Sequence, residues 1–191
     1  MDKVTVFLDG GYISNLTKCT FTGSDGKPKK IDFSVFAEKL VKELGGELLR
    51  VYYYHCPPHQ SVYPTDDERR RKSNYDRFNH ALRQLKRFQV REGRLQKVYD
   101  EKGEPDFIQK GVDVLLAIDM VKLAMKGVIA KAIIVSGDSD FVPAVRAIKD
   151  EGVSVHLFYY KDPNPKNKGY SDFLFQECDE RHELMDNHFD C

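Results

Sequence analysis

The sequence has few cysteines and no long apolar run, and each absence excludes a class of protein. Its four cysteines form no CxxC pair, which indicates free thiols in a reducing cytoplasm: Cys19, Cys56, Cys178 and Cys191. No apolar stretch approaches the ~20 residues that a membrane helix needs. The N-terminal run MDKVTVFLDGG is typical of a core strand rather than of a signal peptide. We therefore expect a cytoplasmic protein that does not bind membranes.

Excess charge of either sign is also missing, so net charge by itself points to no partner. Lysine and arginine total 30, aspartate and glutamate total 30, and the formal net charge at pH 7 is zero. Any charged surface must therefore arise from the distribution of charges along the chain. The length of 191 residues and the 41% of hydrophobic residues predict a single domain over 1–191 with a substantial core.

Short apolar runs alternate with amphipathic stretches along the whole chain. Buried strands are predicted at 4–8, 48–54, 131–135 and 153–159, with a further short strand at 95–99. Helices are predicted at 32–44, 66–90, 112–125 and 141–151. This alternation is typical of an α/β fold with a mostly parallel central sheet, in which ligands bind beyond the carboxyl ends of the strands.

Aspartates directly follow two of the predicted strands. Asp9 comes after the first strand, and Asp138 and Asp140 come after the strand at 131–135. Asp113 lies near the start of a helix, and helix starts face strand ends in this architecture. If the two strands are neighbours, these carboxylates meet in one crevice. Converging carboxylates repel each other unless a cation lies between them, and hard oxygen ligands suit Mg²⁺ or Mn²⁺.

Some of these acids have simpler alternative explanations. Aspartate is a good N-cap residue, so either Asp138 or Asp140 could serve only to start the helix that follows. Capping does not account for both of them, nor for Asp9. Asp119 lies about 240° around its helix from the acid at the helix start, so the two cannot easily share one ion. It is expected to support the ligands, to pair with Lys122, or to be an ordinary polar residue.

Three motifs in a fixed order resemble a known family. FLDGG (7–11), KGVDVLLAID (110–119) and SGDSDFVPAVRAIKDEGVSV (136–155) resemble the NYN family, the LabA-like members of the PIN-like nuclease superfamily. The tail SDFLFQECDERHEL (171–184) is similar to the closing helix of that family, so 171–191 is expected to be a closing helix and tail. The resemblance implies a PIN-like, Rossmann-like α/β/α sandwich and metal-dependent cleavage of RNA.

The resemblance also implies roles for particular residues. By position, four aspartates of this chain match the acidic pocket of the family. They are the expected catalytic residues and the expected ligands of Mg²⁺ or Mn²⁺: Asp9, Asp113, Asp138 and Asp140. The polar side chains expected to support them are Asn15, Asp119, Ser136 and Ser139. Many members have Asn three residues after the first Asp, where this chain has Tyr12, and Asn15 is the candidate to replace it.

A strongly basic segment lies in the middle of this neutral chain. Residues 68–97 hold eleven lysines and arginines against three acids, interleaved with aromatic side chains. We expect the segment to follow the phosphate backbone of single-stranded RNA while one phosphate enters the acidic pocket. The expected contacts are Arg69, Arg70, Arg71, Lys72, Arg77, Arg83 and Lys110. The alternative is a solvated helix whose aromatic side chains face the core.

These features predict a metal-dependent ribonuclease that hydrolyses RNA phosphodiester bonds by attack of water. A non-catalytic RNA-binding or adaptor protein with a vestigial acidic pocket is the main alternative, although an unused acid cluster costs stability. A haloacid-dehalogenase-like phosphatase also has an aspartate after its first strand, but its second acid would fall on Gly11. Whether the chain forms a homodimer is left open.

Zinc binding is a weaker alternative. Histidines and cysteines occur in two groups, one following the strand at 48–54 and one near the C-terminus. Neither group has a standard zinc spacing. The candidate ligands are His55, Cys56, His59, Cys178, His182, His188 and Cys191.

Overall fold

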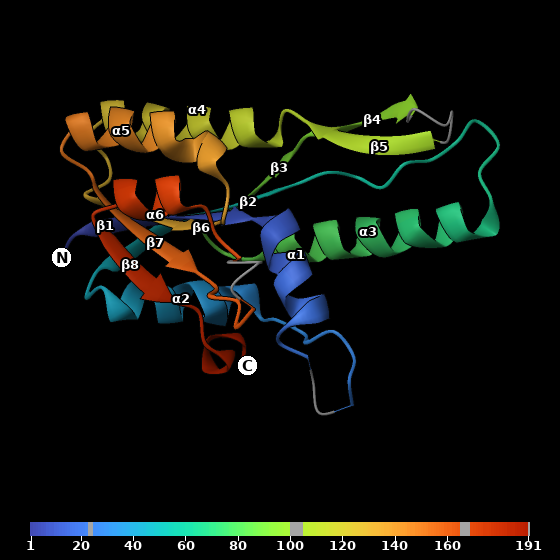
Figure 1. Cartoon of the computed structure of the whole chain (residues 1–191), viewed down its shortest axis with the longest axis horizontal. Coiled ribbons are helices and arrows are strands. Elements are labelled where there is room, and N and C mark those ends of the chain that lie inside the picture. Colours follow the sequence, from blue (N-terminus) through green and yellow to red (C-terminus); the bar gives the residue numbers. More distant parts are fainter. Residues whose placement is uncertain (23–24, 100–104, 165–168, 191) are drawn as a thin grey trace.

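The computed structural model describes residues 1–22, 25–99, 105–164 and 169–190, and its centre is a sheet of six parallel strands (Figure 1). The strands lie in the order β3-β2-β1-β6-β7-β8. Their bounds are Lys3–Asp9 (β1), Glu47–His55 (β2), Phe88–Glu92 (β3), Lys131–Val135 (β6), Ser154–Tyr159 (β7) and Glu180–Glu183 (β8). The prediction of an α/β fold with a parallel sheet is confirmed.

Helices cover both faces of this sheet (Figure 1). The first face packs on α1 (Gly10–Cys19), α2 (Phe33–Glu43) and α3 (Asp66–Gln84). The second face packs on α4 (Val112–Met125), α5 (Val142–Asp150) and α6 (Asp172–Glu177). Two apolar cores result, one on each side of the sheet, and the architecture is the expected α/β/α sandwich.

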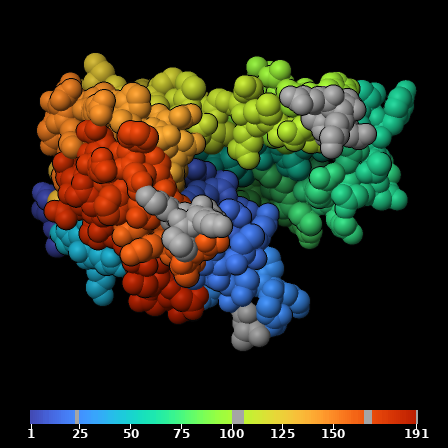
Figure 2. All heavy atoms as spheres, viewed as in Figure 1, coloured from blue at the N-terminus to red at the C-terminus, as the bar shows by residue number. Residues whose placement is uncertain are grey.

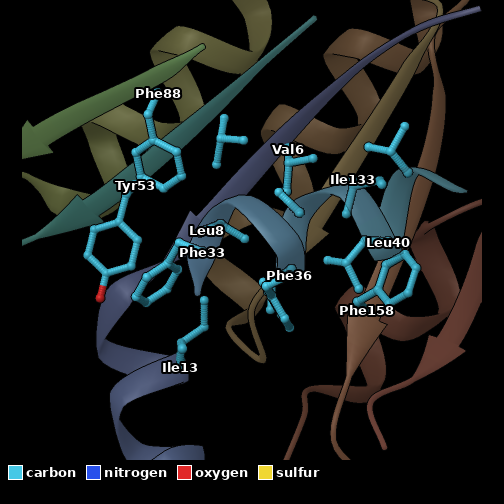
Figure 3. Close-up of a cluster of buried hydrophobic side chains, with 14 of the residues drawn as sticks. Val6, Leu8, Ile13, Phe33, Phe36, Leu40, Tyr53, Phe88, Ile133 and Phe158 are labelled. Carbon is cyan, nitrogen blue, oxygen red and sulfur yellow. The ribbon is translucent and has the colours of Figure 1, made fainter. Parts of the chain in front are cut away.

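The first core shows how the sequence produces this packing. Asp32 caps α2 by accepting the backbone N–H groups of Ser34 and Val35, and the apolar residues that follow recur at helical spacing. Phe36 and Leu40 of α2 are fully buried against the sheet (Figure 3). Burial of each such side chain contributes about 1.5–3 kcal/mol, so the sheet and helix stabilise each other.

The order of the strands creates a switch point between β1 and β6. From β1 the chain builds the sheet outward through β2 and β3, and later through β6, β7 and β8 on the other side. Leu8 at the end of β1 lies opposite Val135 at the end of β6. The residues that follow these two strands are therefore neighbours, as the sequence interpretation required, at the place where open α/β sheets bind ligands.

The structure differs from the sequence prediction at two helices. Residues 10–19, where no helix was predicted, form α1, whose first turn is capped by Asp9. The predicted helix at 66–90 ends at Gln84, where Leu85 becomes extended and Arg87 takes a positive φ of 60°. The chain then enters β3, so the apolar residues near 88–90 belong to a strand rather than to the helix.

Other differences concern strands that the sequence did not reveal. The short strand predicted at 95–99 is β4 (Arg94–Tyr99), and it pairs in antiparallel fashion with the unpredicted β5 (Pro105–Lys110). The C-terminal segment 171–191 was expected to be a closing helix and tail, and the helix that the structure describes there is α6, which ends at Glu177. After α6 the chain forms β8, which adds to β7 at the edge of the sheet.

Two elements project from the same end of the sandwich (Figure 1). They are the amino-terminal half of α3 and the β4–β5 hairpin, and Figure 2 shows a hollow between them. The connection at 56–65 runs between the two, since the ring of His59 lies 4.4 Å from the ring of Phe107 on β5. Leu82, near the carboxyl end of α3, is the one fully buried residue of that helix.

Helix α4 is apolar on nearly all sides, but only one side is buried. Leu116 and Met120 face the second core, whereas Val114, Ile118 and Met125 are 60%, 55% and 69% exposed. The described residues leave this outer face uncovered. None of the helices within the described residues combines the length and the apolarity needed to cross a bilayer.

Candidate active site

Asp9 is the last residue of β1 and the N-cap of α1, so the change from strand to helix fixes its side chain. Its Oδ1 accepts the backbone N–H of Tyr12 at 3.1 Å, and its Oδ2 accepts the hydroxyl of Ser136 at 2.9 Å. Burial raises the pKa of Asp9, although these two donors oppose the rise. The carboxylate is therefore held in one orientation at an electrostatic cost, which a nearby cation would offset.

Ser136 connects the ends of β1 and β6. Its side chain is fully buried, and its Oγ, which donates to Asp9, also accepts the backbone N–H of Asp138 at 3.3 Å. The Oδ1 of Asp138 in turn accepts the N–H of Asp140 at 2.9 Å and caps the short 3-10 helix Ser139–Phe141. Asp138 therefore has the capping role considered from the sequence, whereas Asp140 lies exposed within the capped turn.

Asp113 lies on α4, whereas the other three acids lie at the end of β1 and after β6. Gly111, with a φ of +83°, turns the chain from β5 into α4, so Asp113 falls in the first turn of the helix. Burial raises the pKa of Asp113, and the negative charges of Asp9, Asp138 and Asp140 raise it further. The four aspartates thus share one electrostatic field, although they come from three separate parts of the chain.

Their arrangement sets a limit on how a metal ion could bind. Within the described residues, no three acidic, histidine or cysteine side chains come close enough together to hold an ion. The expectation that all four aspartates would ligate one ion is therefore not met by the arrangement. Mg²⁺ commonly keeps several waters and takes one or two carboxylates together with substrate phosphates. The donor set fits such a hydrated ion and does not fit a closed protein cage.

A cleft of about 970 Å³ opens beside Asp9 and Asp138. Its walls come from α1, from the turn after β6 and from residues that follow β7. Asn15 and Ser139, both expected from the sequence to support the acids, line this cleft, whereas Asp113 and Asp140 are not among its lining residues. The cleft therefore brings together part of the predicted site.

Tyr12, which stands where the resemblance expects Asn, forms part of the cleft wall. Its hydroxyl donates to the carbonyl oxygen of Gly169 at 2.9 Å and accepts the backbone N–H of Tyr160 at 2.8 Å. Gly137 lies against both Tyr12 and Gly169, and a Cβ there would approach the Gly169 oxygen to 2.7 Å. Tyr12 therefore ties α1 to the segment after β7, and Gly137 leaves room for that contact.

Asp119 is paired differently from the sequence interpretation. Its Oδ2 accepts the Nε of Arg91 in β3 at 2.9 Å and the hydroxyl of Tyr54 in β2 at 3.1 Å. The expected pairing with Lys122 is not found among the ion pairs of the described residues, because Arg91 reaches Asp119 from the sheet. Asp119 consequently joins α4 to β2 and β3, and it has no hydrogen bond to the four aspartates within the described residues.

The basic run at the start of α3 is largely neutralised by nearby acids. Arg69 pairs with Asp66, Arg70 and Arg71 pair with Asp67, and Lys72 pairs with Asp76. Asp66 and Asp67 lie just before the segment that looked so basic in the sequence. The expected nucleic-acid contacts at 69–72 are thus exposed, but they are less free than the sequence suggested.

A polar network, not anticipated from the sequence, fastens α3 to the sheet. Glu92 at the end of β3 accepts the hydroxyl of Tyr75, the amide of Asn79 and the guanidinium of Arg83. The ring of His55 stacks on Tyr75 at 4.7 Å. Arg83, expected to bind nucleic acid, is therefore held by Glu92. The one sequence signal for this network is the position of His55 and Glu92 at strand ends.

The histidines considered as zinc ligands have other partners. His59 lies 3.5 Å from Glu68, His188 lies 2.7 Å from Glu43, and His182 stacks on Phe158. Cys191 lies outside the described residues. No metal-binding group is found in the part of the chain that the structure describes, so zinc is not supported there.

Comparison with known proteins gives the family. Over 71 residues the chain is 37% identical to y4oD, an uncharacterized protein of Sinorhizobium fredii. That stretch covers 37% of this chain and 32% of y4oD, so the similarity spans about a third of the relative. The model of the NYN domain matches residues 3–184, nearly the whole chain. The chain therefore belongs to the NYN domain family, whose fold is PIN-like and whose members are generally nucleases.

Proposed function

We propose that this protein is a Mg²⁺- or Mn²⁺-dependent ribonuclease that hydrolyses RNA phosphodiester bonds beside Asp9, Asp113, Asp138 and Asp140. One observation carries the proposal. Burial raises the pKa of Asp113, and the negative charges of the other three aspartates, which lie at the end of β1 and after the neighbouring strand β6, raise it further. An uncompensated cluster of this kind costs stability, and a divalent cation removes that cost.

The residues of the chain suit the binding of a hydrated divalent ion. Asp9 and Asp138 line the cleft and would hold the ion, while Asp113 and Asp140 add negative charge around it. When bound, such an ion neutralises charge on the phosphate and lowers the pKa of water. Ser136 and the N–H of Tyr12 keep the Asp9 carboxylate in place, so it need not reorient during the reaction.

The expected reaction is hydrolysis of single-stranded RNA by attack of water in line with the leaving 3′ oxygen. The P–O3′ bond breaks as the new P–O bond forms, and the products carry a 5′-phosphate and a 3′-hydroxyl. The 2′-hydroxyl takes no part. No serine, cysteine or histidine nucleophile is required, in keeping with the acidic character of the cleft.

The test is a cleavage assay on a labelled single-stranded RNA with analysis of the product ends. We expect cleavage with Mg²⁺ or Mn²⁺, no cleavage with EDTA, and 5′-phosphate products. Asp138→Asn should lower the rate by at least about 100-fold, since it removes a charge that holds the ion. Asp150→Asn is the matched control, because Asp150 lies exposed at the far end of α5. Cleavage that persists in EDTA, or 2′,3′-cyclic phosphate ends, would contradict the proposal.

The second candidate is a non-catalytic RNA-binding or adaptor protein. It is favoured by the absence of three converging ligands within the described residues and by Tyr12 in place of Asn. RNA binding without metal-dependent cleavage would support it over the nuclease. The phosphatase alternative is set aside, because the family is NYN and Gly11 supplies no second acid.

A further inference from the structure

The β4–β5 hairpin carries an exposed face with aromatic and basic side chains. Lys97 lies opposite Phe107 in the antiparallel register, and Tyr99 is two residues further on the same strand face. Tyr99 is 66% exposed and Phe107 is 40% exposed. The Nζ of Lys97 lies 5.2 Å from the centre of the Tyr99 ring. We call Lys97, Tyr99 and Phe107 the hairpin face.

The hairpin face and one side of α3 flank the same short segment of chain. Phe107 contacts His59. Gln60, the residue after His59, borders a groove of about 630 Å³ along α3. The α3 side of that groove, which we call the α3 stripe, consists of Arg69, Lys72, Ser73, Asp76, Arg77 and His80. Figure 2 shows the molecule hollowed between the hairpin and α3.

The two walls differ in how far their charges are compensated. On the α3 stripe, Arg69 and Lys72 each pair with an acid. Among the ion pairs of the described residues, Arg94, Lys97 and Lys110 of the hairpin have no carboxylate partner. Hairpin cations are therefore available to phosphates, and their binding requires no existing pair to break.

The hairpin is also connected to the element that carries one of the aspartates. Lys110 ends β5, and Asp113 follows three residues later in the first turn of α4. At the base of the hairpin, Gly93 donates its N–H to the carbonyl of His55 at the carboxyl end of the sheet. The base of the hairpin is therefore joined directly to the helical turn that carries Asp113.

We propose that the hairpin face and the α3 stripe are the two walls of a binding site for a single strand of RNA, with bases stacked on Tyr99. The chemistry favours single strands, because an exposed ring needs a free base face and a duplex keeps its bases stacked on each other. Lys97 and its neighbours attract the phosphates. The inference deepens the proposed function, since it supplies the path by which substrate reaches the acids.

The test measures binding in EDTA, so cleavage does not enter the readout. The probe is a fluorescent single-stranded RNA of about 12 nucleotides, compared with the same sequence as a duplex. We expect Tyr99→Ala to weaken binding of the single strand by about 5- to 100-fold, the range for loss of one base–aromatic stack. Tyr99→Phe keeps the ring and should bind within about 3-fold of the unchanged protein.

Phe173→Ala is the matched control for the ring, because Phe173 is 75% exposed on α6, away from the hairpin. Lys97→Ala should also weaken binding of the single strand, because it removes a cation of the hairpin face, and Lys126→Ala at the far end of α4 is its matched control. Both controls should leave binding unchanged, and thermal unfolding should confirm that every variant is folded. Equal affinity for single strand and duplex, or equal loss in Tyr99→Ala and Phe173→Ala, would overturn the proposal. Binding as predicted without cleavage would instead refute only the nuclease.

Discussion

At the scale of the single residue, the site depends on how one partly buried carboxylate is held. Ser136→Ala removes the hydroxyl that donates to Asp9, and it leaves the partly buried Oδ2 without that partner. We expect a loss of about 1–3 kcal/mol of unfolding free energy at pH 7, measured by urea denaturation. Ser139→Ala, in the wall of the same cleft, should change stability by less than about 0.5 kcal/mol. Equal effects of the two variants would show that the contact to Asp9 is unimportant.

Repulsion between the same carboxylates predicts how one substitution changes stability when no metal is present. Asp138→Asn removes one of the charges that raise the pKa of Asp9 and Asp113, while the Asn oxygen can still cap the turn before Asp140. The melting temperature in EDTA should therefore rise by a few degrees, since about 1 kcal/mol corresponds to roughly 2–4 °C in a chain of this size.

Mn²⁺ gives the complementary measurement. Added Mn²⁺ should raise the melting temperature of the unchanged protein, because an ion that binds the folded state stabilises it. The rise should be smaller in Asp138→Asn. The control Asp150→Asn should respond to Mn²⁺ as the unchanged protein does. Asp138 is not part of an ion site if Asp138→Asn melts at a lower temperature than the unchanged protein in EDTA and Mn²⁺ raises its melting temperature by as much as that of the unchanged protein.

Residue patterns placed Asp9 and Asp138 at the ends of two strands, but they did not reveal the contacts that each acid makes. Asp9 and Asp138 follow strands, so their convergence depended only on β1 and β6 being neighbours. The two hydrogen bonds of Tyr12 depend on residues 160 and 169, far away in the chain, and no local pattern reveals them. Arg91 likewise competes with Lys122 for Asp119 only once β3 is placed beside β2.

At the scale of the element, α3 is fastened to the sheet through a histidine that folding keeps neutral. Burial lowers the pKa of His55 to about 4, and its Nε2 lies 3.1 Å from the hydroxyl of Tyr75. Its pKa in the unfolded chain is near 6.5, so the unfolded state binds the proton more tightly. The stability that His55 contributes is complete above pH 6.5 and is lost as the pH falls toward 4.

This loss can be measured by comparing variants across that window. The unfolding free energy of the unchanged protein should fall between pH 6.5 and 4.5 more steeply than that of His55→Gln, which cannot take up the proton. His80→Gln is the matched control, because His80 lies exposed on α3. This substitution should leave the slope unchanged. Parallel slopes for all three proteins would show that His55 is not the group responsible.

The central strands found from sequence are those with a strong apolar signal. β1, β6 and β7 are buried on both faces and appear as nearly continuous apolar runs, interrupted at Thr5 and His156. β8, with the sequence ERHE, is a polar edge strand and carries no such signal. Phe88 continued the helical spacing of α3, but the extended backbone of Leu85 and the positive φ of Arg87 separate the helix from the strand.

At the scale of the whole molecule, zero net charge conceals an uneven distribution of available cations. Local composition pointed to α3, but acids one turn away compensate the cations at 69–72. Lys97 and Lys110, two of the hairpin cations without a carboxylate partner among the described ion pairs, lie on β4 and β5, and β5 was not predicted. Composition along a chain cannot show which charges pair with each other after folding, so only the structure indicates which cations remain available to phosphates.

The salt dependence of RNA binding tests this distribution. Each phosphate contact contributes about 0.7 to the slope of log K against log salt for single strands. Lys97→Gln should therefore lower the slope by about that amount. The double variant Lys72→Gln with Asp76→Asn removes an ion pair, keeps the net charge, and should leave the slope nearly unchanged. If instead the double variant lowers the slope and Lys97→Gln does not, α3 rather than the hairpin carries the phosphates.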